Sequence, residues 1–364
     1  MAYETEMPSE RPTSRRRRLL LRVAVIVVAL SLLGFAAFQV FNFSSGTPAN
    51  GVPAARPGAA DGSDTPAPSD SSAGPSGAAG LSKGPVTASA SPTSSAANPP
   101  GAPGPCGAFP NMPNSSCTGW KHTGVSLHSC PTTLSTANAV YDSCQFNGTV
   151  EINASNIQIK RSLVLGRVDP HSDGDLRGVT LTDVEIDGRG NADSNQSAIG
   201  NNNYTCSRCD IHSTGRGANL GYSVIIRDSY IHDFVYSDGA HQTAIGSNGG
   251  SHYQIIHNNL QCNSNAYGCS SALSFYGDDT QIDDALVQNN LFNTDGSYCT
   301  YAGSVSAKPY PKAINVRYLN NLFGRKFKHD CAEFGPVAAY QAGGGNVWTG
   351  NVWQDGTGTI DPQS

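Results

Sequence analysis

The octapeptide Val224-Ile-Ile-Arg-Asp-Ser-Tyr-Ile231 returns 29 residues later in related form, as Tyr253-Gln-Ile-Ile-His-Asn-Asn-Leu260. In both copies, apolar or aromatic residues occupy positions one, three and eight, and a small or amide residue occupies position six. The pattern begins at eight places, at intervals of 20 to 32 residues: Ile157, Val179, Tyr204, Val224, Tyr253, Ala285, Val316 and Asn346. A repeat with this period predicts a solenoid, in which each copy forms one coil.

The parity of the pattern indicates a turn within each copy. Positions one and three lie on the same face of a strand, whereas position eight has the opposite parity, so the chain must turn between positions three and six. Position six is Ser162, Val184, Cys209 and Ser229 in the first half, then Asn258, Asn290, Asn321 and Asn351 in the second. The four asparagines predict a ladder of amides that hydrogen-bond from coil to coil, although asparagine is also a common turn former.

These repeats resemble the right-handed parallel β-helix of the pectate-lyase-like superfamily, and the two octapeptides carry that resemblance over roughly residues 150–355. Phe323-Gly-Arg325, Gly335-Pro-Val337 and Gly343-Gly-Gly-Asn-Val-Trp348 are also similar to segments of uncharacterised secreted β-helix proteins of actinomycetes. The expected fold is an all-β, right-handed parallel β-helix of about eight coils over residues 151–364. Its long side would offer an open surface to an extended ligand.

The N-terminal part of the chain has a different composition. Residues 1–22 form a basic tail with six arginines, and residues 23–43 are apolar and long enough to span the ~30 Å hydrocarbon layer as a helix. The arginines predict a cytoplasmic N-terminus and a single-pass plasma-membrane anchor, with the C-terminal domain outside the cell. A signal peptide whose cleavage yields a secreted protein is the alternative. Residues 44–105, rich in Ala, Pro, Ser and Gly, are expected to form a disordered linker.

All ten cysteines follow residue 105, and their even number fits disulfide formation outside the cell. Three pairs come within reach through the repeat, a short loop or the predicted turn: Cys299 with Cys331, Cys262 with Cys269, and Cys206 with Cys209. A metal or redox site at Cys206-x-x-Cys209 is the alternative for the last pair.

The ends of an open β-stack need cover, because they expose unpaired strand edges and core. Residues 106–150 are expected to form a cap over the first coil, held by two bridges of open pairing among Cys106, Cys117, Cys130 and Cys144. Trp348 and Trp353 are expected to fill the last coil at the other end.

The charge of the C-terminal part excludes one class of partner. Residues 106–364 contain 15 Lys and Arg against 22 Asp and Glu, a net charge near −7. Such an acidic domain is not expected to bind nucleic acid. It can still bind a polyuronate if calcium bridges the carboxylates.

The resemblance implies lyase chemistry on polysaccharide, in which a cation neutralises a uronate carboxylate and a Lys or Arg removes the neighbouring proton. The candidate calcium ligands are Asp278, Asp279, Asp283 and Asp284. The candidate catalytic residues are Arg325, Lys326 and Lys328, from the one dense basic patch after the cytoplasmic tail, and His241, which suits acid–base work near neutral pH. The residues expected to contact the glycan are Asp238, Tyr276, Tyr301 and Tyr340. Solvated turns and loops are the alternative for the aspartates and the basic patch, and a structural hydrogen bond is the alternative for His241.

Two other functions stay open beside β-elimination of a uronate-containing glycan. The first is a non-catalytic surface rod that binds cell-wall or host glycans, because the fold alone does not establish catalysis. The second is a glycoside hydrolase, since Asn293-Thr-Asp-Gly296 resembles the first carboxylate motif of the polygalacturonase family. The chain lacks that family's Gly-His-Gly and Arg-x-Lys motifs, which favours a corner role for Asp295.

Overall fold

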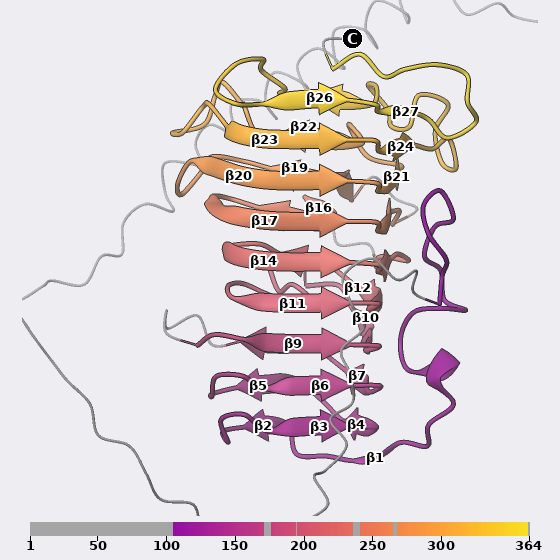
Figure 1. Ribbon diagram of the computed structural model, residues 1–364, viewed down its shortest axis with the longest axis vertical. Helices are drawn as coiled ribbons and strands as arrows, with labels where there is room; N and C mark the ends of the chain where they lie inside the picture. The colour runs from indigo at the N-terminus through magenta and orange to yellow at the C-terminus, as the bar shows by residue number, and fades with distance from the viewer. Residues whose placement is uncertain (1–104, 171–175, 194, 236–240, 265–267, 363–364) are drawn as a thin grey trace, which may run out of the picture. The chain divides into compact units, whose positions relative to one another are not determined.

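The computed structural model describes residues 105–362 except 171–175, 194, 236–240 and 265–267. These residues form an all-β stack of long parallel sheets, an arrangement compatible with a parallel β-helix solenoid (Figure 1). The described part contains no α-helix, and its one helical element is the 3-10 turn η1 (Lys121–Thr123).

Each coil passes in turn through three sides of the stack, which are built from parallel strands. The first side, called the sheet of ten, contains β1 (His128–Ser129), β4 (Cys144–Phe146), β7 (Leu163–Leu165), β10 (Glu185–Asn191), β12 (Asp210–Thr214), β15 (Tyr230–Ile231), β18 (Asn259–Cys262), β21 (Leu291–Thr294), β24 (Leu322–Phe323) and β27 (Val352–Trp353). The second side, called the sheet of nine, contains β3 (Val140–Asp142), β6 (Gln158–Lys160), β9 (Val179–Thr182), β11 (Tyr204–Ser207), β14 (Tyr222–Arg227), β17 (Gly250–Ile256), β20 (Ile282–Gln288), β23 (Ile314–Leu319) and β26 (Val347–Thr349).

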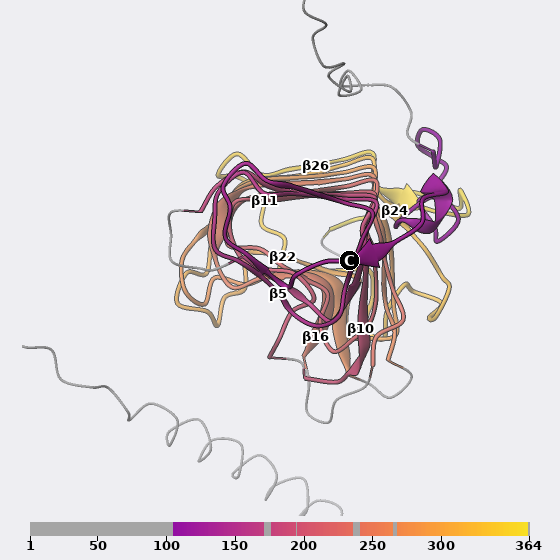
Figure 2. The ribbon, with the colours of Figure 1, turned by 90° about the horizontal axis from the view of Figure 1, so that it is seen from below.

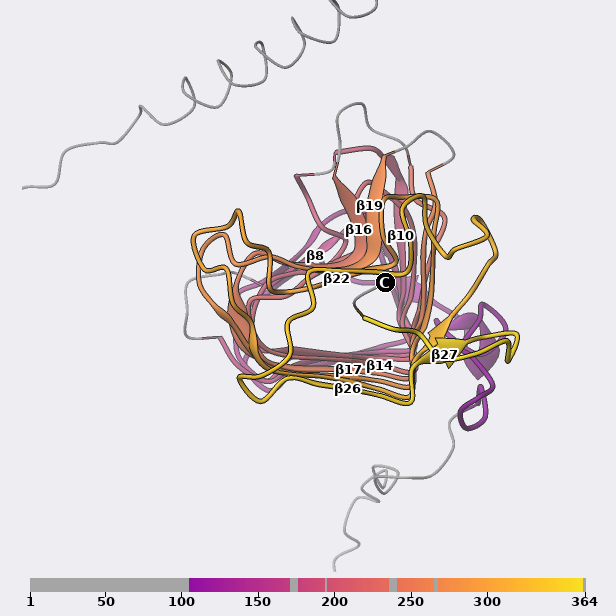
Figure 3. The same ribbon diagram turned by 90° about the horizontal axis from the view of Figure 1, so that it is seen from above.

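The third side consists of two shorter sheets joined through isolated bridges at Ile199. The sheet of three contains β2 (Thr133–Leu134), β5 (Val150–Ile152) and β8 (Val168–Pro170). The sheet of five contains β13 (Ala218–Asn219), β16 (Gln242–Ser247), β19 (Cys269–Phe275), β22 (Thr300–Ala302) and β25 (Val337–Ala338). Views along the stack from its two ends show the sides arranged around a common interior (Figures 2 and 3).

The core consists of the residues that the repeat places inward. Positions three and eight are buried in the first seven predicted copies, as Ile159 with Val164 and Ile255 with Leu260 illustrate. Parallel pairing keeps equivalent positions in register, with Ile226 opposite Ile255 and Ile255 opposite Val287. In the last copy, Trp348 and Trp353 are half-buried and pack against the core, and Trp348 stacks on Tyr318 at a ring-centroid distance of 4.9 Å. The predicted inward face is therefore confirmed.

The predicted turn lies at position five of the repeat. The residue at that position has left-handed backbone geometry in every copy: Arg161, Asp183, Arg208, Asp228, His257, Asn289, Asn320 and Gly350. One residue with positive φ reverses the inward and outward parity of the side chains that follow, because it breaks the alternation of the strand. Position eight thereby points inward, as positions one and three do.

The amide ladder is confirmed in the second half of the stack. The side-chain Nδ2 atom of Asn258 donates to Oδ1 of Asn290 over 3.0 Å, Asn290 donates to Asn321 over 3.0 Å, and Asn321 donates to Asn351 over 2.9 Å. Each amide nitrogen also donates to a backbone carbonyl, as Asn290 does to Ile255 over 2.7 Å. Ser229 continues the row in the first half, because its backbone N–H donates to Oδ1 of Asn258 over 3.0 Å. The ladder thus satisfies polar groups at a fully buried corner.

The N-terminal boundary of the stack differs from the expected cap. The described residues form nine coils rather than eight, and the additional first coil uses β1, β2 and β3. An earlier copy of the repeat runs through β3 and β4, with Tyr141 opposite Ile159 and Phe146 opposite Val164. Residues 128–150 therefore extend the stack instead of covering it.

Residues 105–124, here called the strap, lie beside the sheet of ten (Figure 1). The strap's Asn111 carbonyl oxygen accepts from His257 over 2.7 Å, and its Gly119 N–H donates to the carbonyl of Arg208 over 2.9 Å. Farther along, Lys121 pairs with Glu185 over 3.0 Å. The strap is held to the side of the stack because its partners Glu185, Arg208 and His257 belong to the fourth to the sixth coil.

Five disulfides cross-link the described residues: Cys106–Cys117, Cys130–Cys144, Cys206–Cys209, Cys262–Cys269 and Cys299–Cys331. The last three join the cysteines that the sequence pairs. The bridges fit an extracellular or secreted protein. The predicted anchor at residues 23–43 and the linker at 44–105 lie outside the described residues, apart from residue 105. Within the described ranges, no helix has the length and hydrophobicity needed to cross a bilayer.

Candidate functional site

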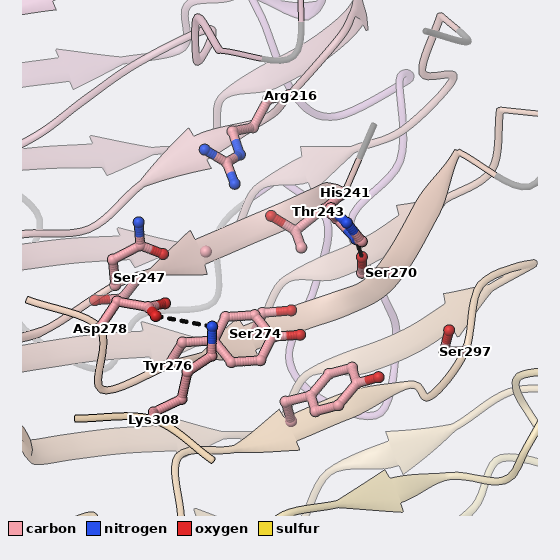
Figure 4. Close-up of a pocket in the computed structure, with 13 residues that line it drawn as sticks. Arg216, His241, Thr243, Ser247, Ser270, Ser274, Tyr276, Asp278, Ser297 and Lys308 are labelled. Carbon is pink, nitrogen blue, oxygen red and sulfur yellow. Dashed lines mark hydrogen bonds and ion pairs between the residues drawn. The ribbon is translucent and has the colours of Figure 1, made fainter. Parts of the chain in front are cut away.

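A cavity of about 410 Å³ opens on the sheet of five, over strands β16, β19 and β22 (Figure 4). Its lining combines charged, hydroxyl and aromatic side chains: Arg216, His241, Thr243, Gly246, Ser247, Asn248, Ser270, Ser274, Tyr276, Asp278, Ser297, Tyr301 and Lys308. A concave site with a few convergent polar groups is the usual form of a small-ligand or sugar site.

Successive coils supply equivalent positions on the two edges of the cavity. At the edge where the strands begin, His241 precedes β16, and its Nδ1 atom lies 3.3 Å from Oγ of Ser270 in β19. The next coil adds Ser297, whose backbone N–H donates to the carbonyl of Ser270 over 3.0 Å. At the edge where the strands end, the backbone N–H of Tyr276 donates to the carbonyl of Ser247 over 2.8 Å. The stacking of coils therefore aligns these side chains along the axis.

Arg216 precedes β13 and has no ion pair with any residue that the structure describes. Its Nε atom is buried without a hydrogen-bond partner, and Figure 4 shows its guanidinium directed toward the other lining side chains. Burial lowers the pKa of this guanidinium from its usual value, yet arginine keeps its charge in proteins. The hydroxyl of Thr243, which is only 2% exposed, likewise has no partner within the described part of the chain. A buried polar atom without a partner is costly, and the guanidinium of Arg216, which lines the cavity, favours a ligand that accepts hydrogen bonds.

Two tyrosines and one ion pair form the floor and the far edge of the cavity. The rings of Tyr276 and Tyr301 lie 5.2 Å apart at 45°. Lys308 pairs with Asp278 over 2.8 Å, and its Nζ atom lies 5.0 Å from the centroid of the Tyr276 ring. Burial raises the pKa of the Tyr276 phenol, and it raises the pKa of the Tyr301 phenol in the same direction. Both phenols are therefore protonated at neutral pH and can donate hydrogen bonds.

Four of the residues that the sequence predicts line this one cavity: His241, Tyr276, Asp278 and Tyr301. Tyr340 lies elsewhere, at the C-terminal end, where its ring meets that of Trp348 edge to face at 5.5 Å. Asp238 lies outside the described residues.

The predicted basic patch follows β24, on the side of the stack formed by the sheet of ten, and does not line the cavity. Arg325 pairs with Asp355 and lies 3.9 Å over the ring of Trp353. Nearby, Lys326 donates to Oε1 of Gln261 over 2.7 Å. Lys328 pairs with Glu333 over 2.6 Å. The three basic side chains of the patch are therefore engaged in contacts with neighbouring residues outside the cavity.

The four aspartates of the predicted calcium site do not converge. Asp278 pairs with Lys308, whereas Asp284 on β20 lies 3.4 Å from the guanidinium of Arg317. Asp283 accepts from Asn315 over 3.1 Å, and Asp279 is exposed. In the ranges that the structure covers, one group of three potential metal ligands lies close together, His128 with Cys130 and Cys144, and these cysteines form a disulfide. The aspartates as placed do not fit a calcium ion, and no reaction step is assigned to one.

The other nine lining residues were missed from the sequence, among them Arg216, Thr243 and Lys308. Arg216 precedes β13, and the register that pairs Ala218 with Ile245 places Arg216 in line with Thr243 of the next coil, which the sequence did not single out either. Lys308 is an isolated charge in the connection between β22 and β23, and no sequence pattern distinguishes it from a solvated lysine.

No family model matches the chain, and neither a curated protein nor a solved structure matches it.

Proposed function

We propose that this protein binds an acidic polysaccharide in the cavity on the sheet of five and cleaves it by β-elimination at a uronate residue. The observation that carries the proposal is the half-buried Arg216, whose Nε atom has no hydrogen-bond partner and whose guanidinium lines the cavity without an ion-pair partner in the described part of the chain. A uronate carboxylate would supply the missing charge, because its two oxygens match the paired N–H groups of a guanidinium. The tyrosine rings and hydroxyl side chains suit the apolar faces and hydroxyl groups of a sugar.

The cavity offers a residue for each step of such a reaction. Arg216 neutralises the carboxylate and thereby acidifies the proton on the adjacent carbon. Neutral His241 accepts this proton, and the electron pair of the broken C–H bond forms a carbon–carbon double bond as the glycosidic C–O bond breaks. The phenol of Tyr301 donates its proton to the leaving oxygen. Solvent then reprotonates Tyr301 and removes the proton from His241.

Hydrolysis is less well supported. A glycoside hydrolase uses two carboxyl groups that flank the scissile bond, whereas the described lining contains one carboxylate, Asp278, which is paired with Lys308. Asp295 is absent from this lining, and its backbone N–H donates to the carbonyl of Cys262 over 3.1 Å. The cavity thus lacks the carboxylate pair of that mechanism among the residues the structure describes.

We also propose that the stack is a right-handed β-helix of the pectate-lyase-like type, because crossover connections between parallel strands are almost always right-handed. The five disulfides support a position outside the cell. The apolar segment at residues 23–43 supports attachment to the plasma membrane, and its cleavage would instead release a secreted protein.

The test uses the full chain, purified in detergent and assayed on polygalacturonate, polyglucuronate and polymannuronate. β-Elimination creates an unsaturated product that absorbs in the ultraviolet, whereas hydrolysis creates reducing ends without this absorbance. Each assay is run with calcium and with EDTA, because a substrate carboxylate could add ligands to one of the aspartates. We expect Arg216→Ala to lower kcat/KM by about 100-fold or more, through loss of charge stabilisation in a desolvated site.

The matched control is Arg177→Ala, which removes an exposed arginine that is not in the cavity lining and should leave kcat/KM unchanged. Full activity of Arg216→Ala would contradict the proposed role of Arg216. Saturable binding of a polysaccharide without any product would contradict the proposed enzyme activity and support the non-catalytic binding rod.

A further inference from the structure

Phe334 is the most exposed large hydrophobic side chain among the described residues, at 68%. Its backbone is nevertheless held in place. The N–H of Phe334 donates to the carbonyl of Ser297 over 2.9 Å, and the loop is anchored by the Cys299–Cys331 disulfide. Phe334 therefore holds an apolar ring at the surface on a fixed backbone.

Aromatic rings connect Phe334 with the cavity on the sheet of five. The ring of Tyr298 lies 6.0 Å from that of Phe334 and 5.4 Å from that of Tyr301. Tyr301 in turn lies 5.2 Å from Tyr276 at the cavity floor. The four residues therefore form a continuous row, here called the aromatic track, whose outer end is Phe334.

The aromatic track spans three successive coils. Tyr276 follows β19, Tyr298 and Tyr301 lie before and in β22, and Phe334 precedes β25. Two steps of the strand spacing separate Tyr276 from Phe334 along the axis of the stack, which corresponds to about 10 Å. That length exceeds one sugar ring, so an oligomeric ligand is needed to fill the aromatic track.

A second cavity, of about 420 Å³, lies at the outer end of the aromatic track and includes Phe334 in its lining. The rest of its lining is apolar or acidic: Asp330, Glu333, Gly335, Pro336, Trp353, Thr359, Ile360 and Asp361. This lining has three carboxylates and no Lys or Arg, although Glu333 pairs with Lys328 over 2.6 Å and Asp330 with the exposed His329 over 2.7 Å. The first cavity has the opposite balance, because Arg216 adds a positive charge to the paired Lys308 and Asp278. A carboxylate is thus favoured in the first cavity and repelled from the second.

We infer that Tyr298 and Phe334, with the second cavity, form a subsite for an uncharged sugar of the chain whose acidic sugar binds Arg216. The ligand class is then an acidic heteropolysaccharide, in which uronate and neutral sugars are neighbours, rather than a polymer of uronate alone. The apolar face of a neutral sugar stacks on an aromatic ring without bringing charge close to Asp330 and Glu333. This inference rests on the proposed function in one respect, the placement of the acidic sugar at Arg216.

The experiment measures the affinity of the full chain by calorimetry for two hexasaccharides. One contains glucuronate alone, and the other alternates glucuronate with N-acetylglucosamine. We expect the alternating hexasaccharide to bind about tenfold tighter, because the uniform one places a carboxylate beside the acidic cavity. We expect Phe334→Ala to weaken the alternating ligand about fivefold, a typical loss for one stacked ring, and to leave the alternating disaccharide unaffected.

The control is Tyr222→Ala, which removes an aromatic side chain of 46% exposure on β14 of the sheet of nine and should change neither affinity. Equal affinity for the two hexasaccharides, tighter binding of the uniform one, binding of neither, or an unchanged affinity in Phe334→Ala would overturn the inference. Failure of the proposed function is seen separately, because β-elimination is followed by ultraviolet absorbance and not by affinity. Tighter binding of the alternating ligand without elimination would support the subsite and refute the lyase.

Discussion

Substitution of Asn290 by alanine tests whether the amide ladder stabilises the stack. Asn290 is fully buried at the corner between β20 and β21. Its Oδ1 atom accepts from the backbone N–H of Asn258 over 2.9 Å and from the side-chain Nδ2 of Asn258 over 3.0 Å. Its own Nδ2 donates to the carbonyl of Ile255 and to Oδ1 of Asn321. Alanine removes all four hydrogen bonds and leaves their partners buried.

The expected magnitude follows from the groups that lose their partner. The Asn258 side-chain amide still donates to the carbonyl of Ile226 over 2.9 Å, and Oδ1 of Asn321 still accepts from the backbone N–H of residue 290 over 2.9 Å. The backbone N–H of Asn258 therefore bears most of the cost, and a buried polar group left unsatisfied costs about 1–3 kcal/mol. We therefore expect Asn290→Ala to reduce the free energy of unfolding by about 3 kcal/mol.

Asn290→Ser should cost less, about 1.5 kcal/mol, because Ser229 occupies the same position of an earlier coil. There Oγ of Ser229 accepts from the backbone N–H of Cys209 over 3.0 Å and donates to the carbonyl of Arg227 over 2.8 Å. Denaturant unfolding followed by circular dichroism measures both variants, with Asn147→Ala, an exposed position, as the control. A loss below about 1 kcal/mol for Asn290→Ala, or equal losses for alanine and serine, would refute this account of the ladder.

The remaining predictions concern the strap and the disulfides. Burial of His257 opposes its charge, but hydrogen bonds to Asp228 (2.7 Å) and to the carbonyl of Asn111 (2.7 Å) outweigh it and raise the pKa above its ordinary value of 6.5. The strap's contact at His257 is then fully present below pH 6.5 and weakens as the pH rises through the higher pKa of the folded state. Hydrogen exchange of residues 105–124 should therefore accelerate over that pH range. An equal acceleration in His257→Gln would argue against this role of His257. Replacement of both Cys299 and Cys331, which are 32 residues apart, by alanine should lower stability by about 4 kcal/mol. The corresponding loss for Cys106 and Cys117, which are 11 residues apart, should be smaller, about 3 kcal/mol, and a reversed order in thermal denaturation would count against the loop-entropy argument.

The fold could be predicted because its determinants are local and repeated. An inward residue such as Ile255 recurs in phase in each coil, and the parity change at position eight requires the left-handed residue that His257 provides. The first coil escaped prediction since Ala139 and Tyr141 begin a weaker copy within a cysteine-containing segment, where half-buried residues replace the usual core residues.

The candidate site could be predicted only in part. His241 and Tyr276 could be named from the sequence as residues of types that suit acid–base work and sugar contact, but the sequence did not show that they lie at opposite edges of one cavity. The dense charges around Lys326 predicted a catalytic patch. The sequence did not show that these side chains have partners in other coils, as Lys326 has in Gln261. Arg216 is distinguished by the absence of an ion-pair partner among the described residues, a property that a sequence does not display.

The strap changes how the stack is expected to come apart. In a solenoid whose coils touch only their neighbours, disruption can begin at a free end and advance one coil at a time. Here the hydrogen bond between Asn111 and His257 joins residues 146 positions apart, and it ties the chain that enters the first coil to the middle of the column. Unfolding of the first coil would therefore also have to break the hydrogen bond between Asn111 and His257, which lies several coils farther along the stack. The N-terminal coils should therefore melt together with the middle of the column rather than ahead of it.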